Sequence, residues 1–218
     1  MEVPLAQHVH AVMIDDDLVF LDIDADAYFC LPLPPGLASL DGRRLRTGDT
    51  RLAEELVAAG LARNSDAETI AGREQPQRPV RTARRLLELS PHIRPRLRAR
   101  HLAALGAAIR SGLASKRQSF RQLVEPAARP DTAPPELAGL LADLAVWRRL
   151  APWLPMDGVC LFRSGMLAAF LRALGHQPTW VFGVRTWPFQ AHCWLQADDV
   201  ALDDEAERLS AFAPIFGV

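Results

Sequence analysis

The stretch from Cys160 to Asp204 constrains the fold of this 218-residue chain more than any other part. After Cys160, apolar residues recur at helical spacing up to Gly175, which suits a helix C-terminal cap, so this segment is predicted to be a core helix. Two apolar stretches of strand character follow, at 179–184 and 190–195, and a shorter one leads to Asp204. The sequence therefore predicts a helix and three strands in succession.

Three side chains of this stretch form a candidate catalytic set. Cys160 is predicted at the first turn of the helix, where unpaired N–H groups and the positive end of the helix dipole lower the pKa of a thiol. The thiolate is a nucleophile, and an imidazole such as that of His192 holds it ionised and later protonates the leaving amine. A carboxylate on the other ring nitrogen orients the imidazole. We assign this carboxylate to Asp204, with its neighbour Asp203 as the alternative.

Strand alternation assigns the two residues that follow His192. Successive side chains of a strand point to opposite faces, so Cys193 is predicted to point away from His192 and into the core. Trp194 shares the face of His192, where it either walls a cleft or fills the core. The pattern thus favours Cys160 as the nucleophile of a thiol protease or acyl transferase.

The order of these residues resembles that of the transglutaminase-like fold, in which a helix carries Cys, a strand carries His and the next strand carries Asp. The spacing is also similar, because 32 positions separate Cys160 from His192 and 12 separate His192 from Asp204. A closer resemblance is to the leader peptidases of lasso-peptide biosynthesis. These carry a C-x-x-R-S motif that opens a helix, then an A-H-x-W strand and then Asp. This chain has the matching residues at 160–164, at 191–194 and at Asp204, all within roughly its last third.

This resemblance implies an α+β fold with a transglutaminase-like (papain-like) cysteine peptidase domain that uses Cys160, His192 and Asp204. It implies cleavage of a ribosomal precursor peptide between leader and core, after which a separate ATP-dependent macrolactam synthetase would receive the core. The chain has no G-x-x-x-x-G-K-[ST] loop, so we expect it to use neither ATP nor another cofactor. Two alternatives stay open: a transglutaminase-type acyl transferase, in which an amine resolves the thioester, and a non-catalytic peptide-binding scaffold.

The N-terminal part is predicted to contain short strands followed by helices. Strand-like runs at 8–14, 18–23 and 27–31 are joined by acidic turns, which is typical of an antiparallel meander. Residues 37–40 could form one helical turn, and 49–61 fits an amphipathic helix with a C-terminal cap. A meander followed by helices resembles the PqqD-like winged-helix recognition domains of modified-peptide biosynthesis.

That resemblance implies that a leader peptide adds a strand to the third strand of the meander, beside a groove wall from the following helix. The residues implied in leader binding are Ala27, Tyr28, Phe29, Cys30, Leu31, Leu52 and Leu56. Alternatively, the meander extends the sheet of the catalytic domain. A DNA-binding winged helix is disfavoured, because residues 1–71 carry a net charge of −8 and phosphates would repel them. The expected organisation is a recognition domain at 1–66, a linker at 67–79 and a peptidase domain at 80–218.

The middle of the chain is basic, with a net charge of +11 over residues 73–129, whereas residues 130–218 carry −4. Helices are expected at 80–89, 99–113 and 136–150. The first two are separated by a cluster of arginines: Arg94, Arg96, Arg98 and Arg100. This cluster is either a solvated face or a docking surface for an acidic partner. Nucleic acid is disfavoured as that partner because the basic segment has a single aromatic residue for stacking on bases.

Cysteine usage and hydropathy bear on the compartment. Three widely spaced cysteines argue against a disulfide framework and favour a reducing cytoplasm. No apolar run approaches the roughly 18 residues that span a membrane, and no signal peptide is visible, so no membrane partner is expected. Six scattered histidines give no zinc signature, and no metal is expected.

Overall fold

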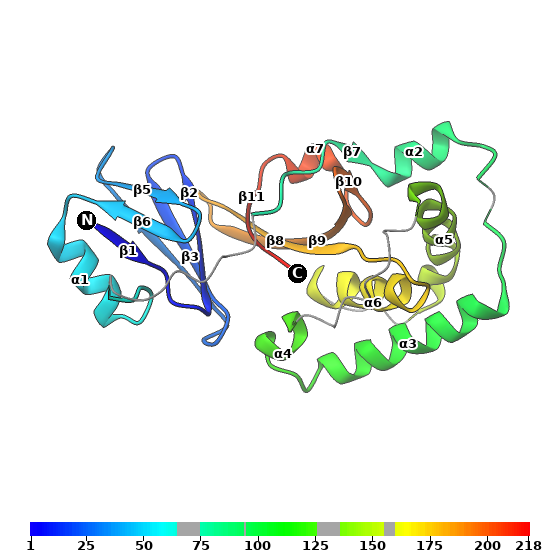
Figure 1. The fold of residues 1–218 in the computed structure, drawn as a ribbon. Coiled ribbons are helices and arrows are strands. Elements are labelled where there is room, and N and C mark those ends of the chain that lie inside the picture. The colour runs from blue at the N-terminus through cyan, green and yellow to red at the C-terminus, as the bar shows by residue number, and fades with distance from the viewer. Residues whose placement is uncertain (65–74, 94, 126–135, 155–159) are drawn as a thin grey trace. The chain divides into compact units, whose positions relative to one another are not determined.

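A computed structural model describes residues 1–64, 75–93, 95–125, 136–154 and 160–218 of the chain (Figure 1). Its contacts divide the chain into two compact units. The first unit contains the N-terminal residues up to Pro76 together with two segments from far along the chain, Gly183–Ala191 and Ala213–Gly217. The second contains Gln77–Phe182, His192–Phe212 and Val218. Part of the expected linker, residues 67–74, lies outside the described residues.

The first unit contains two three-stranded antiparallel sheets and one helix, and its strands are short. One sheet has the order β1-β6-β5 and the other β2-β3-β4. The bounds are β1 Glu2–Pro4, β2 Val9–Ile14, β3 Asp17–Asp22, β4 Ala27–Pro32, β5 Ala38–Asp41, β6 Arg44–Thr47 and α1 Thr50–Ala58. The predicted meander is therefore confirmed. It forms a sheet of its own, so the alternative in which it extends the sheet of the catalytic domain is wrong.

Turn residues explain where these strands end. Asp15 and Asp26 have φ angles of +53° and +50°, a left-handed conformation that aspartate tolerates better than most residues. The single helical turn expected at 37–40 is wrong, because Ala38–Asp41 forms β5 and pairs with β6. Gly42 follows with a φ of +56°, and this Asp-Gly turn signal favours a hairpin over a helical turn.

The strand β3 is buried on both of its faces. Leu18 and Phe20 point into a core that they share with α1, and Val19 and Leu21 are also fully buried on the opposite side. β11 (Ala213–Gly217), which belongs to the same unit, contacts both β2 and β3. Helix α1 starts where predicted, since the Asp49 carboxylate accepts hydrogen bonds from the backbone N–H groups of Arg51 and Leu52.

A five-stranded sheet with the order β11-β8-β9-β10-β7 runs through the C-terminal part of the chain. The other bounds are β7 Arg81–Thr82, β8 Thr179–Arg185, β9 Gln190–Ala197, β10 Val200–Ala201, α2 Ala83–Leu89, α3 Ala99–Ser115, α4 Phe120–Val124, α5 Leu137–Leu150, α6 Cys160–Ala173 and α7 Ala206–Leu209, with a 3-10 turn at Ala151–Trp153. The expected mixture of α and β structure is thus confirmed. The helix expected from residue 80 begins only at Ala83, because Arg81 and Thr82 pair with β10.

Helix α6 is the central helix of the second unit. It packs against α3 and α5, and Figure 1 shows α3 and α6 side by side. A Cβ at Gly112 of α3 would lie only 3.0 Å from the sulfur of Met166, so a glycine is what lets these helices approach closely. Gly175 lies two residues after the last residue of α6 and has a φ of +91°, the left-handed conformation that its predicted role as a C-terminal cap requires. The helix therefore begins and ends where the sequence predicts.

Candidate active site

Cys160 is the first residue of α6, and its side chain is half-buried with a free thiol. Its pKa is lowered to about 4, with the largest contribution from a hydrogen bond with the Cys193 thiol. Burial opposes this shift, whereas hydrogen bonds from the His192 side chain and the Cys193 backbone N–H and the charge of His192 support it. These groups stabilise a thiolate at neutral pH, which is the state in which a cysteine is a nucleophile.

His192 lies on β9, and its ring bridges Cys160 and Asp204. Its Nε2 atom is 2.7 Å from Asp204 Oδ2, which leaves Nδ1 for the hydrogen bond with Cys160. The pKa of His192 is raised to about 9, chiefly by the hydrogen bond to Asp204 and then by that to Cys160. A thiolate–imidazolium pair oriented by a carboxylate can attack a carbonyl and then protonate a leaving amine.

The structure distinguishes the two neighbouring aspartates. Asp204 accepts hydrogen bonds from His192 and from the backbone N–H of Glu205. Asp203 accepts instead from the Ser164 hydroxyl and from the backbone N–H of Leu195. The carboxylate in contact with the imidazole is therefore that of Asp204, the first choice from the sequence.

Cys193 has a contact that strand alternation does not reveal. It is buried, as predicted, but its thiol also hydrogen-bonds the thiol of Cys160, and this bond together with burial raises its pKa. The backbone N–H of Cys193 donates to Cys160 as well, so the Cys160 sulfur lies against the β9 backbone and both neighbouring side chains can reach it. Trp194 is fully buried in a hydrophobic cluster and donates to Gln196 Oε1 over 2.9 Å, so it fills the core.

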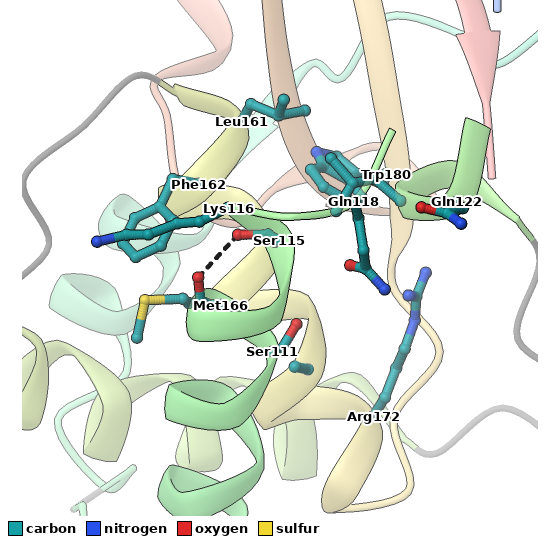
Figure 2. A pocket seen from close by; sticks show the side chains of 14 residues that line it. Ser111, Ser115, Lys116, Gln118, Gln122, Leu161, Phe162, Met166, Arg172 and Trp180 are labelled. Atoms are coloured by element: carbon teal, nitrogen blue, oxygen red, sulfur yellow. Dashed lines mark hydrogen bonds between the residues drawn. The ribbon is translucent and has the colours of Figure 1, made fainter. Parts of the chain in front are cut away.

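A pocket of about 360 Å³ begins at Leu161 and Phe162, the two residues after Cys160 (Figure 2). Its walls come from α3, α4, α6 and Trp180 of β8. Lys116 and Arg172 are among the lining residues, and none of the described lining residues is acidic. Most of the lining is apolar and its charged side chains are cationic, so it suits an apolar or anionic group more than a cationic one.

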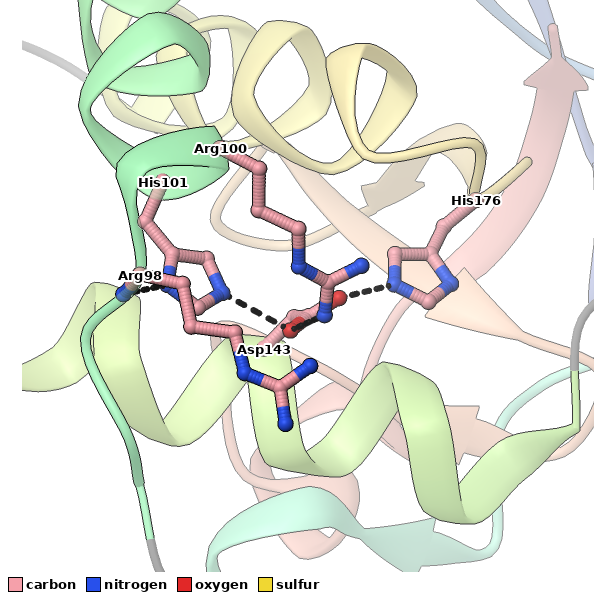
Figure 3. A network of polar contacts seen from close by, with 5 residues as sticks. All are labelled: Arg98, Arg100, His101, Asp143 and His176. Atoms are coloured by element: carbon pink, nitrogen blue, oxygen red, sulfur yellow. Dashed lines mark hydrogen bonds and ion pairs between the residues drawn. The ribbon is translucent and has the colours of Figure 1, made fainter.

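A second network of histidine and aspartate lies elsewhere in the second unit (Figure 3). Asp143 of α5 accepts from His101 Nε2 at 3.0 Å and from His176 Nε2 at 2.8 Å, and Arg100 lies 2.6 Å away. Sequence reasoning missed this network. The available signal was Asp143 itself, a charged residue within the apolar stripe of Leu140, Leu141 and Leu144.

The residues predicted to bind a leader lie in the first unit. β4 is an end strand of its sheet, and within the described residues no strand pairs with its outer edge. Phe29 and Cys30 are exposed, and the Tyr28 ring lies 5.8 Å from that of Phe189. Leu31 packs partly against the core, whereas Leu52 and Leu56 are buried within it. Whether these residues contact a leader stays a prediction.

Within the described part of the chain, no group of three or more histidine, cysteine, aspartate or glutamate side chains is arranged to hold a metal ion. The helices described there also lack the combination of length and apolarity that crossing a bilayer requires. Of the arginine cluster, Arg94 lies outside the described residues, and Arg100 pairs with the buried Asp143.

A half-buried cysteine at a helix start, hydrogen-bonded to a histidine that an aspartate orients, has the arrangement that thiol acyl transfer requires. A family model described as the transglutaminase-like superfamily matches residues 101–217, which is more than half of the chain. The chain therefore belongs to the transglutaminase-like superfamily. A search of curated proteins found no match, and neither did a search of solved structures.

Proposed function

We propose that this protein is a cysteine peptidase that binds the leader of a ribosomal lasso-peptide precursor and cleaves it at the leader–core junction. The observation that supports the proposal most is the continuous set of hydrogen bonds from Cys160 through His192 to Asp204. The family supports peptidase or acyl-transfer chemistry. The choice of substrate is supported by the C-x-x-R-S and A-H-x-W motifs around Cys160 and His192.

In the proposed reaction, the Cys160 thiolate attacks the scissile carbonyl carbon, and the C–N bond breaks to leave a thioester with the leader. His192 gives its proton to the departing amine of the core. The neutral imidazole then takes a proton from water, whose oxygen attacks the thioester. The leader leaves as its acid, and Cys160 leaves as the thiolate, which restores the pair with protonated His192. Asp204 holds the imidazole in orientation throughout. The freed core amine would be the substrate of a separate ATP-dependent macrolactam synthetase.

Leader binding is proposed at the outer edge of β4. A strand edge presents N–H and C=O groups that an extended peptide can pair with, while alternate side chains meet surfaces on either face. One such surface is the tip of the β8–β9 hairpin, which belongs to the same unit. There Phe189 contacts Tyr28, and Trp187 is 75% exposed while its indole N–H donates to Asp17 over 2.6 Å. The side chains of a leader paired with β4 would contact the rings of Trp187 and Phe189.

The test uses the whole chain and a short candidate precursor peptide, sought among the genes that neighbour its own. Mass spectrometry should show two products, the leader acid and the core amine, with water added across one peptide bond. Transfer to an added primary amine, giving an isopeptide product, would instead support a transglutaminase. Binding without any covalent change, with Cys160 unreactive toward iodoacetamide, would support a scaffold and overturn the proposal.

A further inference from the structure

Two residues close to the candidate active site have no role in the reaction described above. Ser164 donates its hydroxyl proton to Asp203 Oδ2 over 2.5 Å, and the backbone N–H of Leu195 donates to Asp203 Oδ1 over 2.8 Å. Ser164 lies one helical turn after Cys160, on the same side of α6. Leu195 lies on β9, the strand that carries His192. Asp203 thus connects the helix of the nucleophile to the strand of the base.

The Asp203 carboxylate is turned into the protein although the residue as a whole is exposed. Both of its oxygens meet buried groups, since Ser164 is 2% exposed and Leu195 is fully buried. Burial is the largest influence on its pKa and raises it to about 6, against the two hydrogen bonds that favour the charged form. Burying a carboxylate that has two uncharged donors and no cation beside it lowers the free energy of unfolding. A functional role would explain why Asp203 is placed there.

We propose that Ser164 and Asp203 are a positioning pair that sets the placement of Cys160 relative to His192. Asp203 and Asp204 are consecutive residues with different roles in this proposal. Asp204 orients the imidazole, and Asp203 connects Ser164 in the second turn of α6 to β9. The inference rests on the proposed function in treating Cys160 as the nucleophile and His192 as the base. A small displacement of the two groups is expected to slow the reaction strongly, because attack requires close alignment.

The hydrogen-bond partners predict opposite effects of the same substitution at the two aspartates. In Asp203→Asn, the amide oxygen can accept from Leu195 N–H while the amide N–H donates to the Ser164 hydroxyl, which can rotate to accept. In Asp204→Asn, both partners are N–H donors, and an amide has a single oxygen to accept from them. Asparagine should therefore preserve the positioning pair and disturb the imidazole.

The experiment measures the rate of iodoacetamide alkylation at Cys160 against pH in the full-length chain, with the label located by peptide mass spectrometry. This readout needs no precursor, so it remains informative if the chain does not cleave one. Ser164→Ala and Asp203→Ala should each raise the apparent pKa of Cys160 by about one unit or more. With precursor, kcat should fall about ten- to a hundredfold while KM stays within about twofold. Asp203→Asn should stay within about threefold of the wild type, and Asp204→Asn should lose more than tenfold in kcat.

Thermal unfolding accompanies each variant to establish that it is folded. Should Asp203→Ala fail to fold, the double variant Ser164→Ala/Asp203→Asn replaces it, because it loses only one hydroxyl relative to a tolerated variant and leaves the amide N–H without its acceptor. A folded Ser164→Ala with the wild-type alkylation profile would overturn the proposal. So would an Asp203→Asn variant as impaired as Asp203→Ala, because the carboxylate charge rather than the tie to α6 would then matter.

Discussion

The two histidine–aspartate networks of the second unit differ in the partner of the second imidazole nitrogen and in the exposure of their side chains. In the candidate active-site network, formed by Cys160, His192 and Asp204, the imidazole is 12% exposed and its second nitrogen meets a thiol. In the structural network, formed by Arg100, His101, Asp143 and His176, the side chains of His101 and Asp143 are only 2% and 4% exposed. The second nitrogen of His101 accepts from the backbone N–H of Arg98. Of the two networks, only the first contains a thiol, and it is therefore the one proposed to act on a substrate.

The structural network connects elements far apart in the sequence. His101 lies on α3, Asp143 on α5 and His176 just beyond the end of α6. The Asp143 carboxylate therefore connects α5 to α3 and to the segment after α6. Hydrogen bonds from neighbouring groups are what make a buried carboxylate tolerable. Although burial would raise the pKa of Asp143, the hydrogen bonds from His101 and His176 and the charge of Arg100 lower it overall. Loss of this carboxylate should hence affect folding, whereas loss of the active-site groups should affect catalysis.

The largest expected effect is that of Cys160→Ala, which should abolish cleavage and leave stability unchanged. Removing a nucleophile should reduce precursor cleavage by at least about a thousandfold. Precursor binding and the thermal midpoint should stay near the wild type, because the half-buried thiol contributes little packing. Mass spectrometry of the products and a binding titration measure both effects, with Cys30→Ala, at an exposed thiol of the first unit, as the control. Substantial cleavage by Cys160→Ala would move the nucleophile elsewhere, and Cys193 would be examined next.

Asp143→Ala should show the reverse behaviour. It leaves two buried imidazoles and a guanidinium without their acceptor, and breaking a buried charged network costs about 3–5 kcal/mol of unfolding free energy. Denaturant unfolding measures this loss. The matched control is Asp199→Ala, which breaks the exposed pair with Arg81 and should lower the unfolding free energy far less. Equal losses in the two variants would contradict a structural role for the buried network.

The third prediction concerns how the alkylation rate of Cys160 depends on pH, compared with that of an ordinary thiol. Since its pKa is lowered to about 4, the alkylation rate of Cys160 should change less than about twofold between pH 5.5 and 7.5 and fall as the pH approaches 4. An ordinary thiol, with a pKa of about 8.5, would gain roughly a hundredfold over the same two pH units. In His192→Ala, Cys160 should move toward that ordinary profile. A steep wild-type profile would mean that no thiolate–imidazolium pair forms.

The smallest effect is expected in the first unit, at Cys30→Pro. The pairing of β4 with β3 turns the N–H of Phe29 toward Phe20 and that of Cys30 toward the outer edge. Proline at Cys30 removes this outward donor and restricts φ, so an added strand on β4 should lose about tenfold in affinity, or roughly 1.4 kcal/mol. Cleavage should recover at high precursor concentration, because the active-site groups belong to the second unit. Asp204→Asn is the matched contrast, with lower kcat and unchanged leader affinity. Circular dichroism of the full chain establishes that β4 still folds. Unchanged affinity in a folded variant would refute strand addition at this edge.

The sequence predicts well what depends on neighbours along the chain. The apolar spacing after Cys160 predicts α6, the amphipathic pattern with a C-terminal cap at 49–61 predicts α1, and acidic turns predict the meander from β2 to β4, all of which the structure contains. The candidate site could be predicted as far as the order of Cys160, His192 and Asp204, because a motif preserves order and spacing. The hairpin of β5 and β6 was missed, since four-residue strands carry too little periodic signal.

Other features depend on contacts between distant segments, and only the tertiary structure decides them. The sequence leaves Asp203 as an alternative to its neighbour Asp204, yet Asp203 contacts Ser164 of α6 and Asp204 contacts the imidazole of His192. The hydrogen bond between Cys193 and Cys160 arises because the start of α6 lies against the backbone of β9. The sequence by itself determined the local elements and the order of the reactive groups. The tertiary structure decided their partners, because hydrogen bonds between side chains form only where folding brings together segments that are far apart in the chain.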